Sequence, residues 1–254
     1  MGRTSHGSRE NLPVSPSARP VRAVVLDFFG TVARATASIG LGEILARHGY
    51  TIPEHLQEMW WSGDIDGHEH VEQSRSRDHY LAWQRERLLA MLHAADVHPG
   101  EHQKILDDLE AGRAARVLEA YDEVPGVLDD LRAHGLRLAI CSNWDWDLEP
   151  AIAEAGLAGR FDTLVSSAWA GARKPHPRIY RYLLQQAGLD PADVLFVGDT
   201  WAPDVEGPRA AGMRPAYLER EGHWPDATRP ADSSGIPVAR IRDLTGILPL
   251  LGPG

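Results

Sequence analysis

Short apolar runs alternate with amphipathic stretches along most of the chain, and this alternation predicts the fold. The apolar runs predict strands over residues 21–27, 136–141, 163–165, 194–197, 214–218 and 238–241. The amphipathic stretches between them predict helices over residues 148–155, 177–186, 205–211 and 244–251. Strands that alternate with helices of about ten residues are typical of parallel β-α-β units. We therefore expect an α/β fold built on a doubly wound parallel sheet.

Residues 34–122 have a different pattern, with no convincing strand and several stretches of helical periodicity. These stretches cover residues 39–47, 54–61, 68–93 and 102–116. The pattern predicts an all-helical domain inserted after the first strand, which divides the α/β core into residues 21–33 and 123–254. Residues 1–20 combine Arg, Pro, Ser and Gly without an apolar stretch, so we expect a disordered leader there.

Composition narrows the class of partner. The 26 basic and 36 acidic residues give a formal net charge of −10, which argues against nucleic acid or an anionic membrane as the main partner. No apolar run approaches the roughly 18 residues that a membrane-spanning helix needs. The single cysteine, Cys141, cannot form an internal disulfide, so a cytoplasmic location is expected. The sequence leaves open whether the protein is a monomer or a homodimer.

Polar residues follow four of the predicted strands, at the point where each strand ends. They are Asp27 after the first strand, Ser142 and Asn143 after the second, Lys174 in the loop after the third, and Asp199 and Asp204 after the fourth. In a doubly wound sheet, ligands bind beyond the carboxyl ends of the strands. We therefore expect these side chains to meet in one cleft, although residues more than 170 positions apart contribute to it.

The residue types in this group have complementary chemistry. The three aspartates form a hard oxygen site of the kind that Mg²⁺ prefers, with room for waters and substrate oxygens. The Ser142 hydroxyl and backbone N–H groups at the start of the next helix are able to hold a phosphate. Lys174 adds a positive charge, and Gly30 lets the backbone approach closely. A carboxylate in the position of Asp27 is a candidate nucleophile.

Four segments, LDFFGTV, ICSNWD, ARKPHP and VGDTWAPD, resemble the four motifs of the haloacid dehalogenase-like hydrolases and follow that family's order. The inserted helical domain resembles the family's type-one cap. The resemblance covers roughly residues 21–250 and is strong because four short motifs each stand at a strand end. It implies a hydrolase that acts on a phosphate ester of a small metabolite.

The resemblance also implies roles for particular residues. Asp27 is expected to be the nucleophile that forms an aspartyl-phosphate. Ser142, Asn143 and Lys174 are expected to bind the transferred group, together with Gly30 and Thr31. Mg²⁺ is the expected cofactor, held by Asp27, Asp199 and Asp204 with the backbone carbonyl of Phe29.

One residue departs from the family pattern. Phosphatases of the family usually carry a second aspartate two residues after the nucleophile, as general acid and base, and Phe29 stands there in this chain. General acid–base help is worth roughly 10²–10⁴-fold in rate. A phosphatase with Phe29 therefore needs a good leaving group or another proton donor, and the candidate donors are Asp64, His68, His70 and Asp145.

Three other interpretations accommodate Phe29. Dehalogenases of the family also carry an aromatic residue at this position, but they need no Mg²⁺, so Asp199 and Asp204 argue against that branch. Phosphonate hydrolases of the family use a cap lysine, for which Lys104, on what looks like an exposed helix face, is the single candidate. A protein that has lost turnover and only binds a ligand is the last alternative, and the intact charged residues argue against it.

Two further interpretations concern the surroundings of the site. Asp66 is interpreted as the N-cap of a helix that begins near residue 67. Among Trp144, Trp169 and Trp201, which lie beside or between the motifs, one or two are expected to narrow the cleft.

Overall fold

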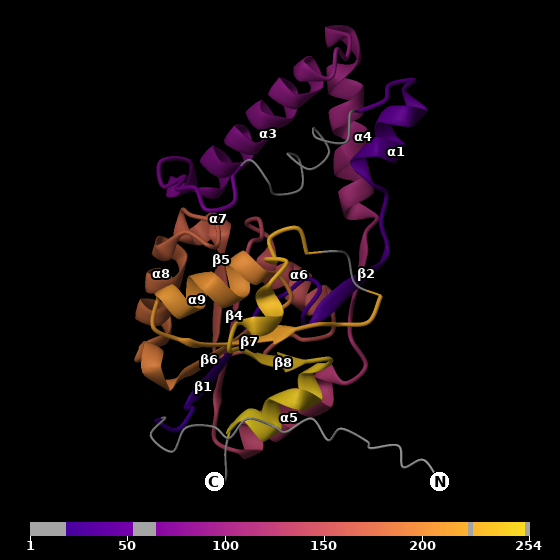
Figure 1. Cartoon of the computed structure of the whole chain (residues 1–254). Coiled ribbons are helices and arrows are strands. Elements are labelled where there is room, and N and C mark those ends of the chain that lie inside the picture. Colours follow the sequence, from indigo (N-terminus) through magenta and orange to yellow (C-terminus); the bar gives the residue numbers. More distant parts are fainter. Residues whose placement is uncertain (1–18, 53–64, 223–225, 252–254) are drawn as a thin grey trace, which may run out of the picture.

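The core of the protein is a six-stranded parallel sheet, seen in a computed structural model that describes residues 19–52, 65–222 and 226–251 (Figure 1). The strand order is β5-β4-β1-β6-β7-β8. The strands are β1 (Ala23–Leu26), β4 (Arg137–Ser142), β5 (Thr163–Ser166), β6 (Val194–Gly198), β7 (Arg214–Leu218) and β8 (Ala239–Ile241). Every neighbouring pair is parallel, so the predicted doubly wound parallel sheet is confirmed.

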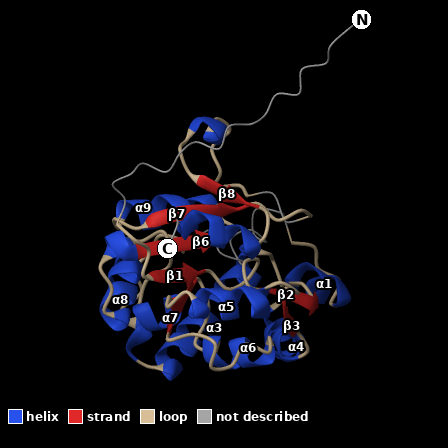
Figure 2. Ribbon diagram, turned by 90° about the horizontal axis from the view of Figure 1, so that it is seen from below, coloured by secondary structure: helices blue, strands red, loops and turns tan. Residues whose placement is uncertain are grey.

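Helices cover both faces of this sheet (Figure 2). Val24 and Leu26 of β1 pack on one face with α5 (Val124–Ala133), α6 (Leu148–Glu154) and the 3₁₀ helix η7 (Leu244–Leu251). Ala23 and Val25 pack on the opposite face against α8 (Pro177–Ala187). Because β1 is buried on both faces, its sequence is a continuous apolar run rather than an alternating one.

The remaining elements of the core are short. They are α7 (Ser167–Ala170), η4 (Pro191–Asp193), the π-helical turn η5 (Ala202–Glu206), α9 (Gly207–Ala210) and η6 (Ser233–Gly235). The helix predicted over residues 205–211 thus begins earlier, as a π turn. Helix α5 was not predicted, although its buried residues Val124, Val127, Leu128 and Leu131 have the i, i+3, i+4, i+7 spacing of an amphipathic helix.

A helical layer, formed by α1 (Leu41–Arg47), α3 (Arg77–Ala94) and α4 (His102–Ala114), stands beyond one end of the sheet (Figure 1). It also includes the short 3₁₀ helices η2 (Gln73–Arg75) and η3 (Pro99–Glu101). It has its own apolar cluster around Ile44, Leu92 and Ile105. The described residues contain no helix long and apolar enough to cross a membrane.

An antiparallel pair of strands, β2 (Ala33–Ala37) and β3 (Val117–Ala120), joins the helical layer to the core. The prediction that residues 34–122 contain no strand was therefore wrong at both ends of that segment. Between these two strands, the described elements are helical, as predicted. The first 18 residues of the predicted leader and the helix predicted over residues 54–61 lie outside the described residues.

The segment before α3 lies against the core and forms no α-helix; its helical part is the short η2. Its backbone pairs with the loop that carries Lys174 through Gly67 N to Lys174 O at 3.3 Å, Arg173 N to His68 O at 3.1 Å, and His70 N to Gly171 O at 2.8 Å. Helix α3 begins only after Ser76, whose side chain caps it by accepting from His79 N. The predictions of a helix over residues 68–93 and of Asp66 as a helix cap were therefore wrong over this segment.

Candidate active site

Asp27 stands directly at the carboxyl end of β1. Its backbone N–H donates to Val197 O on β6 at 2.9 Å, so the chain is still held by the sheet at this residue. Asp27 as a whole is 7% exposed. The chain then turns at Gly30, whose φ of +84° is a conformation that only glycine adopts without strain. This turn directs the following residues away from the carboxylate and leaves it at the open end of the strand.

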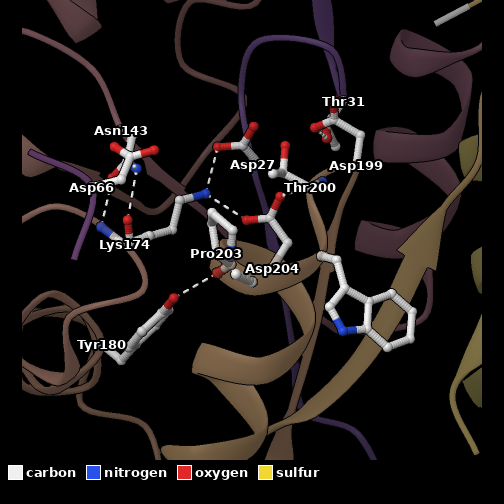
Figure 3. Close-up of polar contacts among 12 residues, drawn as sticks. Asp27, Thr31, Asp66, Asn143, Lys174, Tyr180, Asp199, Thr200, Pro203 and Asp204 are labelled. Atoms are coloured by element: carbon white, nitrogen blue, oxygen red, sulfur yellow. Dashed lines mark hydrogen bonds and ion pairs between the residues drawn. The ribbon is translucent and has the colours of Figure 1, made fainter. Parts of the chain in front are cut away.

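Two more carboxylates meet Asp27 at this edge of the sheet (Figure 3). One oxygen of each of Asp27, Asp199 and Asp204 lies within 4.8 Å of the others. Thr200 N donates to Asp204 Oδ2 at 3.0 Å, and the Thr31 hydroxyl donates to Asp199 Oδ1 at 3.1 Å. The loop after β6 and the turn after β1 thus hold the three side chains as one group.

Lys174 lies between two of these carboxylates and is 2% exposed. Its Nζ donates to Asp27 Oδ1 at 2.7 Å and to Asp204 Oδ1 at 2.6 Å (Figure 3). Asn143 fixes the backbone of the same lysine, because its Oδ1 accepts from Lys174 N at 2.6 Å and its Nδ2 donates to Lys174 O at 3.0 Å. The motif after β4 therefore positions the lysine of the next motif.

Burial and charge act in opposite directions on these groups. Burial raises the pKa of Asp27 and of Asp204 above the usual range of a carboxyl, and Lys174 opposes the rise in both. Burial alone would lower the pKa of Lys174, but Asp204 and Asp27 outweigh it, so its pKa lies above the ordinary value. The lysine is therefore a permanent cation, while the carboxylates lack enough positive charge around them.

A cavity of about 320 Å³ lies between the helical layer and the segments that follow the carboxyl ends of the strands. Of the predicted site residues, Asp27, Phe29, Ser142, Asn143, Lys174 and Asp204 line it. Thr31 is fully buried and holds Asp199 instead of lining the cavity. Gly30 is buried within its turn. The structure therefore brings most of the predicted residues to the cavity wall and places Thr31 and Asp199 one layer behind it.

The wall beside Asp27 is aromatic. Phe29 and Trp144 both line the cavity, with ring centroids 6.2 Å apart, and Trp144 also packs edge-on against Phe28 at 5.0 Å. The prediction that one or two tryptophans narrow the cleft is confirmed for Trp144. Trp201, in contrast, is fully buried against Tyr217. Position 29 thus offers an apolar surface and no proton.

The predicted substitutes for a proton donor are differently placed. Asp145 lines the cavity, but it accepts hydrogen bonds from Tyr80 at 2.8 Å and Gln84 at 2.9 Å and pairs with Arg113. Burial alone would raise the pKa of Asp145, but Arg113 and Tyr80 hold it below its usual range, so it is ionised and has no proton to give. His68 is exposed, and Asp64 lies outside the described residues.

His70 is buried away from the cavity wall. It is 4% exposed, stacks on Trp83 with centroids 4.9 Å apart, and shares a hydrogen bond of 2.9 Å between its Nδ1 and Ser74 Oγ. Its Nε2 is buried without a partner among the described residues. Burial, with Arg173 adding to it, lowers the pKa of His70 to about 4. The imidazole is therefore neutral at the pH of most assays.

This burial predicts an acid sensitivity of the fold. His70 takes up a proton in the unfolded chain below a pH of about 6.5, but in the folded chain only near pH 4, so the fold loses stability as the pH falls between these values. Between about pH 7 and about pH 4.5, the wild type should lose on the order of 2 kcal/mol more than His70→Gln. Urea denaturation at both pH values measures the free energy of unfolding of each protein. His134→Gln, at an exposed histidine, is the control, and equal losses in wild type and His70→Gln would contradict the assignment.

Several cavity residues were missed by the sequence analysis. Four arginines line the cavity, namely Arg87, Arg113, Arg116 and Arg173. Asp66 lines it too and accepts from Arg173 Nε at 2.6 Å and from Asn143 Nδ2 at 3.2 Å. Arginine supplies nearly all basic residues of the chain, so spacing alone did not distinguish these four. Asp66 was missed because it lies in a turn, next to the backbone hydrogen bonds with the core, and such a turn leaves no periodic signal.

Known proteins of one family resemble this chain in sequence. The sequence profile of a family described as haloacid dehalogenase-like hydrolase matches residues 21–212. The chain is 35% identical over 134 residues to human "Haloacid dehalogenase-like hydrolase domain-containing protein 3", covering 52% of each protein. It is 35% identical over 133 residues to a phosphoserine phosphatase of Thermus thermophilus, covering 52% of this chain and 51% of that protein.

Dehalogenases are relatives as well. The chain is 33% identical over 139 residues to haloacetate dehalogenase H-2 of Moraxella, covering 52% of this chain and 61% of that protein. The chain thus spans about half the length of the first curated relatives it matches.

Solved structures share the fold over nearly the whole chain. A predicted phosphoglycolate phosphatase from Haemophilus somnus has a TM-score of 0.64 at 19% identity, covering 91% of this chain and 97% of that one. A dehalogenase structure has a TM-score of 0.60 at 22% identity, covering 92% and 99%. At these identities the likeness concerns the fold, whereas the profile match covers most of the sequence. The chain therefore belongs to the haloacid dehalogenase-like hydrolase family.

Proposed function

We propose that the protein is a Mg²⁺-dependent phosphatase that hydrolyses a phosphate ester of a small metabolite, with Asp27 as nucleophile. The observation that carries this proposal is the cluster of three carboxylates beside one buried lysine, of which Asp27, Asp204 and Lys174 line a single cavity. A transferring phosphoryl group needs positive charge on several sides, and the lysine with a divalent cation supplies it. The phosphatases among the relatives are consistent with the proposal.

The donor set fits Mg²⁺. Fully ionised, the three carboxylates carry two more negative charges than the ammonium of Lys174 offsets, within a buried site that disfavours them. Asp27, Asp199, Asp204 and the backbone carbonyl of Phe29 are the residues that would hold the ion, all through the hard oxygen atoms that Mg²⁺ prefers. When bound, Mg²⁺ supplies Lewis-acid stabilisation of phosphoryl oxygens.

The side chains divide the chemistry between them. Lys174 holds Asp27 Oδ1, so we assign the attack on phosphorus to Oδ2. As the new O–P bond forms, the ester P–O bond breaks and the alcohol oxygen leaves with the bonding electrons. Water then attacks the aspartyl-phosphate, which releases phosphate and restores the carboxylate. Lys174 stabilises the transferring oxygens, and the Ser142 hydroxyl, on the cavity wall, donates a hydrogen bond to them.

Phe29 determines which esters react well. No acid stands at position 29, and Asp145 is ionised, so the leaving oxygen takes its proton from water. We therefore propose that, among the esters that fit the cavity, the rate of hydrolysis rises as the pKa of the leaving alcohol falls. In this proposal, residues 34–122, which include the helical layer, are the cap. The cap closes over the substrate and excludes bulk water.

A substitution at Gly198 tests how the metal site is built. A Cβ at this residue of β6 would lie 2.3 Å from the carboxyl carbon of Asp204, a distance that no relaxed structure permits. Gly198→Ala should therefore displace Asp204 and raise the Mg²⁺ concentration for half-maximal activity roughly tenfold or more. Gly126→Ala on α5 is the control, because its Cβ would meet open space. An unchanged Mg²⁺ requirement in Gly198→Ala would remove Asp204 from the proposed ligand set.

Dehalogenation is the second candidate, favoured by the aromatic wall of Phe29 and Trp144 and by the dehalogenase relatives. A halide leaves without a proton, so the absence of an acid at position 29 costs nothing in that reaction. Asp27 would then attack carbon, and the metal site would have no use. The phosphonate-hydrolase alternative loses support, because Lys104 is exposed on α4 and does not line the cavity.

A substrate screen with and without Mg²⁺ decides between the two candidates. The purified chain is tested against phosphorylated metabolites, an aryl phosphate and 2-chloroacids, each in EDTA and in excess Mg²⁺. We expect Mg²⁺-dependent release of phosphate and no release of chloride. Chloride release that is undiminished in EDTA, without hydrolysis of any phosphate ester, would establish the dehalogenase instead.

A further inference from the structure

We infer that Arg116 and Trp144 form a subsite that binds a carboxylate of the substrate, so that the substrate is a phosphate ester of a small carboxylic acid. Both residues line the same cavity as Asp27. That the substrate is a phosphate ester rests on the proposed function. That it carries a carboxylate rests on the two side chains alone.

The two side chains are in direct contact and incompletely satisfied. The Arg116 guanidinium lies over the Trp144 ring, with its carbon 4.7 Å from the ring centroid. Arg116 Nε and Trp144 Nε1 are both buried N–H donors without a hydrogen-bond partner among the described residues. Buried donors are normally paired. Two unpaired donors on contacting side chains at a cavity wall therefore indicate that a ligand brings the acceptor.

Arg116 also differs from the three cations of the cavity that pair with carboxylates. Lys174 pairs with Asp27 and Asp204, Arg173 pairs with Asp66, and Arg113 pairs with Asp145. Arg116 has no ion pair with any residue in the described part of the chain. Burial lowers the pKa of its guanidinium, and Asp147 opposes this from beyond ion-pair distance, but an arginine stays charged at neutral pH. The charge of Arg116 therefore has no close counterion among the described residues. A carboxylate of the substrate would supply one.

The geometry favours a carboxylate over a more highly charged group. A guanidinium held over an indole ring presents a rigid fork of N–H donors, which matches the two oxygens of a carboxylate. Asp145 and Asp147 line the same cavity and would repel a group of higher charge. The cavity volume of about 320 Å³ lies at the lower limit of ligand pockets, which suits a compact metabolite.

A matched pair of esters tests the subsite. Phosphate esters of short hydroxy acids are compared with the esters of the corresponding carboxamides, which keep the size and lose the charge. We expect the wild type to prefer the carboxylate ester by roughly 10- to 100-fold in kcat/KM, the effect of one hydrogen bond to a charged group. Arg116→Gln should remove this preference by raising KM for the carboxylate ester, with little effect on the carboxamide ester or on an aryl phosphate.

Arg85→Gln is the control variant, because Arg85 is an exposed arginine of the helical layer that pairs with Gln103 and does not line the cavity. It should keep the full preference. Trp144→Phe keeps the aromatic platform and removes the orphan Nε1, so it should lose only part of the preference. Equal kcat/KM for both esters in the wild type would overturn the inference, as would an equal loss for both esters in Arg116→Gln.

Binding separates this inference from the proposed function. In an Asp27→Asn background, calorimetry compares the affinities of the two esters with Arg116 present and with Arg116→Gln. If an aryl phosphate is hydrolysed but neither turnover nor binding distinguishes the esters, the inference alone fails. If no phosphate ester is hydrolysed but the carboxylate compounds bind through Arg116, the phosphatase fails and the subsite stands.

Discussion

Asp27→Asn is expected to lower kcat for hydrolysis of an aryl phosphate by roughly 10³-fold or more, because an amide cannot attack phosphorus and form the aspartyl-phosphate. Asparagine keeps the shape of the side chain, and its oxygen still accepts from Lys174. The fold should therefore be retained, and KM should change little. Initial rates at saturating Mg²⁺, together with the thermal unfolding midpoint, separate the loss of the nucleophile from a loss of structure.

Asp129→Asn is the control for this prediction, since Asp129 is an exposed aspartate that pairs with Arg160 on the surface. It should keep the wild-type rate. Asparagine at position 27 can slowly deamidate back to aspartate, whereas alanine cannot, so Asp27→Ala is a second variant. It should be equally inactive. A rate within about tenfold of wild type in Asp27→Ala would show that Asp27 is not the nucleophile.

Lys174→Met is expected to have the largest effect on stability. Lys174 is the ammonium in contact with Asp27 and Asp204, and removal of one partner from a buried ion pair costs about 3–5 kcal/mol. We therefore expect the free energy of unfolding, measured in EDTA near neutral pH, to fall by about that amount. Activity should be lost as well, because the charge that stabilises the transferring phosphoryl group is gone.

The chain contains its own matched control, because Lys104 is its second lysine and is exposed on α4. Lys104→Met should change the free energy of unfolding by less than about 0.5 kcal/mol and leave activity intact. Added Mg²⁺ should restore part of the stability lost in Lys174→Met, since a divalent cation compensates the same carboxylates. Equal stabilities of the two methionine variants in EDTA would contradict the electrostatic account of the site.

The sheet and the cluster of Asp27, Lys174 and Asp204 were predictable because both depend on local patterns. Each buried strand is a short apolar run, and each run ends in a polar residue, so the parallel topology alone brings Asp27, Lys174 and Asp204 together. The register of β1 against β4 and β6 places these ends at one edge of the sheet.

The cavity wall contributed by residues 65–116 was not predictable in the same way. Asp66 reaches the cavity because the turn that contains it is hydrogen-bonded to the loop of Lys174, a long-range contact without periodicity in the sequence. Arg116 follows the end of α4 and lies over the ring of Trp144. The two residues are far apart in the sequence, and only the tertiary packing brings them together. Strands β2 and β3 are short, and more than half of their residues are exposed, so they lack the apolar run that marks a core strand.

The most direct test of the central claim is a single-turnover reaction with a phosphate ester in Mg²⁺, quenched in acid and analysed by peptide mass spectrometry. The account predicts one phosphoryl group on the Asp27 carboxylate during turnover, and none in Asp27→Asn. Consumption of the ester without a phosphoryl group on Asp27 would contradict it. So would an ester formed on Asp27 from a 2-chloroacid in a protein that cleaves no phosphate ester.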